Sequence, residues 1–267
     1  MTQSIRWLQD EIATRMLQKL DIVKLPVKDL LVMPDFPGAH ARFLTKRFSG
    51  LRFHSAPEES LSGLKLFQLK AARLWQSRFQ SCANISIAEF NKTGRILLPD
   101  NSVDLVFSIL LLHELTDPKQ FLHECWRVIK EGGLVTLSYL GPDTAKELHQ
   151  APLPPDFEIQ ALVSPWDMHD MGDALIGEGF SDPVMDMEFL NLSYESNDVF
   201  LRDVAALNLL KFPLEHQSNL DLFTEKMTLE VVYGHAWVLG KQLARARDSV
   251  AYIDINQIGH KASRVLP

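Results

Sequence analysis

Apolar residues recur at helical spacing near the start of the chain. Ile5, Leu8, Ile12, Met16 and Leu20 lie three or four residues apart, with polar and charged residues between them. This period places the five side chains on one face of a helix. The first twenty residues therefore predict an amphipathic helix that packs on the rest of the protein.

Further along, short apolar runs alternate with segments of helical composition. The run at 103–110 is apolar on both faces, as is typical of a parallel strand covered by helices on each side. Turn residues separate these segments: Pro34 to Gly38 follow the first strand, and Gly132 and Gly133 are expected to end a helix. We predict strands over 30–33, 51–54, 85–90, 103–110 and 134–140, and helices over 39–48, 57–82 and 117–130.

Strands that alternate with helices of this length indicate parallel βαβ units. In such a sheet, ligands bind at the carboxyl ends of the strands, near the switch in strand order. The loops after Met33, His54, Phe90, Ser108 and Leu140 are therefore the places where a site is expected.

Composition narrows the choice of partners. The formal net charge is -7 and the isoelectric point about 5.7, so no overall positive field favours nucleic acid or an anionic membrane. No run approaches the roughly 20 apolar residues that span a bilayer.

The 2 cysteines, Cys82 and Cys125, form no CxxC pair, and His113, His169 and His235 lack ligand spacing, so no metal site is expected. A cytoplasmic location is the simplest expectation.

Several segments carry a specific resemblance. Asp100 to Ser108, followed by Trp126 to Gly133, resembles the middle of class I S-adenosylmethionine methyltransferases. Five further segments resemble a narrower family, the malonyl-acyl-carrier-protein O-methyltransferases of biotin synthesis. These segments are 138–148, 167–175, 179–188, 201–203 and 233–237. The likeness covers roughly residues 5 to 240, and we expect one methyltransferase-like domain over 1–240 and a tail of unknown role over 241–267.

The resemblance implies a Rossmann-like α/β fold: a seven-stranded, mostly parallel sheet with helices on both faces and an N-terminal helical addition. It also implies methyl transfer from S-adenosylmethionine to the free carboxylate of malonyl-acyl-carrier protein, or of malonyl-CoA. A carboxylate is ionised at neutral pH and the sulfonium is a strong methyl donor, so catalysis is mostly alignment. The lack of a nucleophile and base pair therefore does not argue against this reaction.

Three residues are candidates for the substrate side. Arg202 lies in a family-matching segment and is expected to select the malonyl carboxylate, although a surface or helix-pairing role is equally open. Tyr139 and Asp143 follow the fifth predicted strand, where Gly141 to Thr144 also read as a turn that leads into a helix.

The cofactor side departs from the family pattern. The family carries a glycine-rich turn and an acidic residue at the end of the first strand, but here only Gly38 remains and Val32 takes the acidic position. The acid expected after the second strand falls on His54 or Ser55. If the pocket has been rebuilt, the cofactor-binding candidates are Asp35, Gly38, His54, Ser108, Ile109 and Leu110.

Two hypotheses therefore stay open: an active methyltransferase with a rebuilt pocket, and an inactive protein of the same fold that acts as a binding or assembly partner, with another protein subunit as one possible partner. Docking of an acidic carrier protein requires a local basic surface. Arg42, Lys46, Arg47 and Arg52 offer one such surface, and Lys241, Arg245 and Arg247 a second.

Overall fold

The computed structural model describes most of the chain in several stretches: residues 3–35, 40–57, 86–150, 166–207, 209, 225–241, 245–247 and 250–252. Within these residues, a six-stranded sheet has the order β2-β1-β3-β4-β6-β5. The first four strands in this order run parallel, and β6 is antiparallel to both β4 and β5. The strands are β1 (Asp29–Asp35), β2 (Arg52–Pro57), β3 (Val103–Ile109), β4 (Ile129–Leu140), β5 (Ser181–Ser193) and β6 (Lys226–Trp237).

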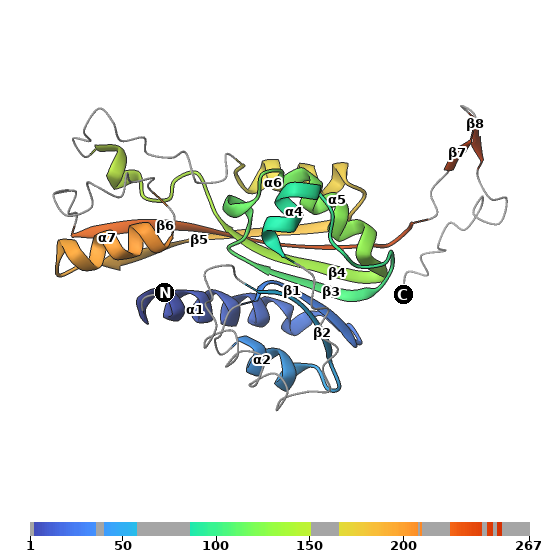
Figure 1. Cartoon of the computed structure of the whole chain (residues 1–267), viewed down its shortest axis with the longest axis horizontal. Coiled ribbons are helices and arrows are strands. Elements are labelled where there is room, and N and C mark those ends of the chain that lie inside the picture. The colour runs from blue at the N-terminus through green and yellow to red at the C-terminus, as the bar shows by residue number, and fades with distance from the viewer. Residues whose placement is uncertain are drawn as a thin grey trace, which may run out of the picture.

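Helices cover both faces of this sheet (Figure 1). On one face lie α1 (Gln3–Lys19), α2 (His40–Arg47) and α7 (Asn197–Ala206), and on the other lie α4 (Ile87–Thr93), α5 (Pro118–Val128) and α6 (Met168–Gly177). Three short 3-10 helices complete this part of the chain: η1 (Leu20–Ile22), η2 (Leu112–Glu114) and η3 (Lys146–Gln150). The expected α/β class, the mostly parallel sheet and the N-terminal helical addition are confirmed. The sheet has six strands among the described residues, where seven were expected.

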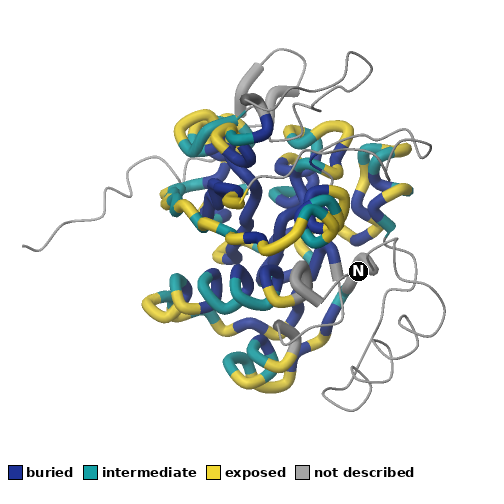
Figure 2. Tube along the Cα trace, turned by 90° about the vertical axis from the view of Figure 1, so that its left-hand side faces the viewer, coloured by how far each residue is buried: buried dark blue, intermediate teal, exposed yellow. Residues whose placement is uncertain are grey.

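The apolar face predicted for the first helix packs on the sheet. Leu8, Ile12, Met16 and Leu20 are each at most 1% exposed and join one of two buried clusters, which lie on opposite faces of the sheet. Figure 2 shows burial along the trace, with buried positions inside the molecule and exposed ones on outer turns and helix faces. None of the described helices is long and apolar enough to cross a membrane.

One predicted strand and one predicted helix end are wrong. Residues 87–90, expected in a strand, begin α4, because the hydroxyl of Ser86 accepts a hydrogen bond from the Glu89 backbone and caps the helix. The Gly132–Gly133 pair does not end a helix, because α5 already stops at Val128 and β4 begins at Ile129. Gly132 has a left-handed φ of 81° where the pairing of β3 with β4 shifts register, so it forms a bulge within the strand.

The C-terminal tail contains a two-stranded hairpin among its described residues. It pairs β7 (Arg245–Arg247) with β8 (Val250–Tyr252) in antiparallel fashion. The predicted helix over 57–82 falls outside the described residues apart from Pro57, which ends β2.

A charged cluster joins the amino ends of four parallel strands. Asp29 of β1 accepts hydrogen bonds from Arg52 Nη2 at 2.6 Å and Lys130 Nζ at 2.9 Å, and Lys130 also donates to Asp104 at 2.8 Å. Asp104 accepts from the backbone amides of Lys28 and Asp29, both at 2.8 Å. Burial favours the neutral acid, but the bonds from Arg52 and Lys130 outweigh it and lower the pKa of Asp29.

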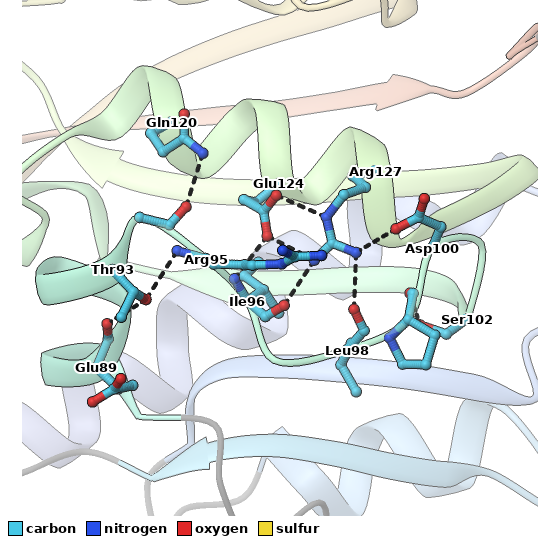
Figure 3. Close-up of polar contacts among 12 residues, drawn as sticks. Glu89, Thr93, Arg95, Ile96, Leu98, Asp100, Ser102, Gln120, Glu124 and Arg127 are labelled. Atoms are coloured by element: carbon cyan, nitrogen blue, oxygen red, sulfur yellow. Dashed lines mark hydrogen bonds and ion pairs between the residues drawn. The ribbon is translucent and has the colours of Figure 1, made fainter.

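A second cluster fixes the loop that precedes β3 (Figure 3). Arg127 of α5 makes two hydrogen bonds to Glu124, at 2.7 Å each, and one to Asp100 at 2.6 Å. It also donates to the carbonyls of Ile96 and Leu98 at 2.7 and 2.9 Å. Glu124 is 4% exposed and accepts from the Ile96 amide, so this arginine neutralises a buried carboxylate.

Replacing Arg127 tests this role. We expect Arg127→Met to lower the free energy of unfolding by about 3 kcal/mol, because it leaves the buried Glu124 carboxylate without its cation. Urea denaturation measures the change. The double variant Glu124→Gln with Arg127→Met is expected to recover part of the loss, whereas a single variant within about 0.5 kcal/mol of the wild type, the range of ordinary surface substitutions, would contradict the assignment.

Candidate functional site

The strand order reverses between β1 and β3. From β1 the chain moves outward to β2, and it returns on the other side of β1 to form β3. The carboxyl ends of β1 and β3 therefore flank the switch point, which is where ligands bind in open α/β sheets. The turn after β3 is described fully, and it carries three unusual features.

The first feature is a strained backbone at Leu110. This residue directly follows β3 and has a φ of 49°, in the left-handed region that costs a non-glycine residue roughly 1–2 kcal/mol. Its amide donates to the Ser138 carbonyl at 2.8 Å, and its side chain is 6% exposed. Strain of this kind persists where surrounding contacts enforce it, and it is common at ligand sites.

The second and third features are buried polar atoms without a partner. Ser108 is fully buried near the end of β3, and its Oγ makes no hydrogen bond in the structure. The Nδ1 of His113, in η2, is buried in the same way. Each such atom costs roughly 1–3 kcal/mol unless a ligand or water satisfies it. Two of these atoms thus lie within six residues of each other, at the end of β3 and in η2.

Burial also sets the charge of His113. Removal from water disfavours the imidazolium and lowers the pKa of His113 to about 4. The ring is therefore neutral at physiological pH, with one donor and one acceptor nitrogen.

The β1 side of the switch point is less polar. Val32, which takes the acidic position of the family pattern, is fully buried among apolar residues and contributes no polar group. The strand continues past the predicted turn, through a cis Met33–Pro34 bond to Asp35, which pairs with Pro57 of β2. Asp35 thus ends β1 at the switch point, while Gly38 lies outside the described residues.

His54 is directed to a different part of the sheet. Its Nε2 lies 3.7 Å from Asp29 Oδ1, in the charged cluster at the amino ends of the strands. Burial lowers the pKa of His54 despite this carboxylate. The structure does not bring His54 together with Ser108, Ile109 and Leu110. The last three lie together where β3 ends, and Ile109 is buried in the core beneath α1 and α2.

The β4 side contains a rigid turn. Glu230 of β6 is 5% exposed, and its carboxylate accepts a hydrogen bond from the Asp143 amide at 2.6 Å. Thr144 bonds to the Glu230 backbone at 3.2 and 3.1 Å, so the turn is held at several points. A Cβ on Gly141 would lie 2.4 Å from the Glu230 side chain, which explains the glycine. The Asp143 side chain is left exposed at this edge.

The other two substrate candidates lie apart from Asp143. Tyr139 is fully buried on the α6 face, where its hydroxyl donates to the Asp167 carbonyl at 2.9 Å. Burial, reinforced by nearby acidic groups, raises the pKa of Tyr139. Arg202 is exposed on α7, and its Nε donates to the Asp198 carbonyl at 3.0 Å within the same helix.

Several residues of the predicted basic patches form ion pairs or hydrogen bonds within the protein. Arg47 forms an ion pair with Asp21, and Arg52 belongs to the Asp29 cluster. Lys241 donates to the carbonyls of Arg127 and Ile129 near the end of α5. Arg42 and Lys46 remain exposed on α2.

The described residues fit S-adenosylmethionine on the β3 side, while on the β1 side the structure describes only the backbone of Asp35. Ser108 and His113 supply unsatisfied polar atoms at the switch point, and Asp35 ends the neighbouring strand. The sequence prediction included Ser108 and Asp35 but considered His113 only as a metal ligand. Its position five residues after Ser108, directly beyond a buried parallel strand, was the available signal.

Comparisons with known proteins agree with the fold and identify its family. A family model described as a methyltransferase domain matches residues 67–137. The chain is 33% identical over 247 residues to a malonyl-[acyl-carrier protein] O-methyltransferase of Gallionella capsiferriformans, covering 86% of this chain and 83% of the relative. It is 32% identical to the enzyme of that name from a Methylovorus species, covering 86% and 82%. The YcgJ protein of Bacillus subtilis shares the fold, with a TM-score of 0.55 at 13% identity over 85% of this chain and 97% of that one.

The Gly141 turn yields a stability prediction with an internal control. We expect Gly141→Ala to lower the free energy of unfolding by about 2 kcal/mol, because the added methyl group displaces the buried Glu230 side chain. Gly177→Ala is the matched control: its Cβ meets nothing within 4 Å at the end of α6, so stability should hold or rise. Urea denaturation of both variants measures the difference, and equal stabilities would contradict the packing argument.

Proposed function

The chain belongs to the malonyl-[acyl-carrier protein] O-methyltransferase family, and on that premise we propose that it transfers the methyl group of S-adenosylmethionine to the free carboxylate of a malonyl thioester. The acceptor is carried by acyl-carrier protein, and the product is its methyl ester. The observation that carries the proposal is the pair of unsatisfied buried polar atoms, on Ser108 and His113, at the switch point of a methyltransferase fold.

The reaction requires alignment more than acid–base chemistry. A carboxylate oxygen attacks the methyl carbon while the bond from that carbon to sulfur breaks, and the electron pair stays on sulfur. The acceptor is already ionised at neutral pH, so no proton has to be removed. What the protein has to provide is a site that orients the two reactants and excludes water.

On the cofactor side, Ser108, the Leu110 backbone and Asp35 are the residues that would hold S-adenosylmethionine, which supplies the methyl group when bound. Ser108 offers a hydroxyl that has no partner among the described residues, and the sequence places an aspartate, Asp35, at the end of β1. Leu110 keeps its turn in a conformation enforced by Ser138. These residues take the place of the glycine-rich turn that the chain lacks.

On the acceptor side, Asp143 and Arg202 lie in segments that follow β4 and β5, beyond the carboxyl edge of the sheet. Arg202 keeps the terminal nitrogens of its guanidinium for a carboxylate, since only Nε bonds to Asp198 among the described residues. Arg42 and Lys46 on α2 supply exposed positive charge for an acidic carrier protein.

A second candidate function follows from the β1 side. Because Val32 is buried where the family has an acid, loss of cofactor binding would leave a methyltransferase fold that serves as a binding partner without catalysis. This alternative and the enzyme differ in one product, the methyl ester.

An assay on defined carrier-protein substrates tests the proposal. Purified protein is incubated with S-adenosylmethionine and malonyl-acyl-carrier protein, and the intact carrier protein is weighed by mass spectrometry. We expect a methyl ester on the malonyl form and no change on acetyl-acyl-carrier protein, which lacks the free carboxylate. An unmethylated malonyl form at stoichiometric enzyme would sink the proposal and favour the binding partner.

A further inference from the structure

His113 lies next to the proposed methyl-transfer site, yet the protein itself uses neither of its ring nitrogens. No hydrogen bond of the described residues involves its side chain, and its Nδ1 is buried. The residue as a whole is only partly buried, so Nε2, and not the buried Nδ1, is the nitrogen that a ligand could reach. A buried polar atom without a hydrogen bond lowers the stability of the free protein, and no contact of the described residues compensates for it.

The two nitrogens differ in what they can do. A buried donor without a partner is costly, so the unprotonated lone pair belongs on Nδ1 and the proton on Nε2. Desolvation, which lowers the pKa of His113 to about 4, keeps the ring in this neutral form. The accessible nitrogen is therefore a hydrogen-bond donor without charge.

A neutral donor suits the reacting carboxylate better than a cation does. The carboxylate loses its negative charge as the methyl group is transferred, so a lysine or arginine on the reacting oxygens would stabilise the starting complex more than the transition state. An uncharged N–H group can orient the reacting oxygen and stabilises the starting complex less than a cation would. It also adds no positive charge beside the sulfonium of the donor.

We infer that His113 is a substrate-contacting residue, whose Nε2–H donates a hydrogen bond to the free carboxylate of the methyl acceptor and so selects malonyl over uncharged acyl groups. This inference deepens the proposed function and rests on it for the identity of the acceptor. The residue that contacts the malonyl carboxylate is then His113 of η2, and not Arg202, which lies on α7.

Binding of two coenzyme A thioesters separates recognition from turnover. Calorimetry with malonyl-CoA and acetyl-CoA, each in the presence of S-adenosylhomocysteine, measures how strongly the protein prefers the carboxylate. We expect His113→Leu to reduce this preference about 10- to 100-fold, as for one hydrogen bond to a charged group. His113→Gln places an amide donor near the position of Nε2 and is expected to recover much of it.

Stability provides a readout that a structural role would not share. Because His113→Leu removes an unsatisfied polar atom, its melting temperature should equal or exceed that of the wild type. His123→Leu, on the exposed face of α5, is the matched control and should leave the thioester preference unchanged. A lower melting temperature together with an unchanged preference would assign His113 a structural role and overturn the inference.

Other outcomes are equally decisive. If His113→Leu weakens S-adenosylhomocysteine binding as much as malonyl-CoA binding, the histidine serves the cofactor and the inference fails. It also fails if the wild type does not prefer malonyl-CoA. Should the leucine variant not fold, the ¹⁵N shift of the wild-type Nε2 must respond to malonyl-CoA and not to acetyl-CoA, and an unresponsive shift overturns the inference. A wild type that shows the preference but no methyl transfer would sink the proposed function alone.

Discussion

The charged cluster at the amino ends of the parallel strands is the constraint on which the rest of the structure depends. Asp29 and Asp104, with Arg52 and Lys130, connect β1, β2, β3 and β4 at one edge of the sheet. Because these contacts fix the relative position of four strands, the carboxyl ends of β1 and β3 meet at a defined place. The opposite edge can then carry strained and unsatisfied groups without loss of register.

Several residues of the resembling motifs serve the fold and take no part in the proposed chemistry. Asp104, in the segment typical of class I methyltransferases, bonds to backbone amides and to Lys130, and Arg127 neutralises buried Glu124. Both residues hold loops and strands in place. The functional groups that we propose lie at the carboxyl ends of β1 and β3, and it is the β1 end that departs from the family pattern. Similarity in the motifs therefore indicates the fold, and the proposed activity depends on individual residues at the carboxyl ends of the strands.

Local patterns predicted the parts of the fold that depend on them. The period of the first helix and the continuous apolar run of β3 gave correct elements, because burial on one or both faces leaves a direct mark on the sequence. The start of α4 was missed because its apolar residues also suit a strand and only the Ser86 cap decides between them. The direction of His54 depends on Asp29, which lies 25 positions earlier in the chain, and the orphaned Nδ1 of His113 depends on tertiary burial. Neither has a local signature.

The central claim is that this chain binds S-adenosylmethionine through a site rebuilt around Ser108 and Asp35, although Val32 and the missing glycines depart from the family pattern. Calorimetric titration of the purified protein with S-adenosylhomocysteine, the demethylated product, tests it most directly. The account predicts a saturable isotherm with one site per chain and a dissociation constant on the order of micromolar. An absence of saturable binding up to about millimolar ligand would contradict it, because the binding free energy would then be weaker than roughly 4 kcal/mol.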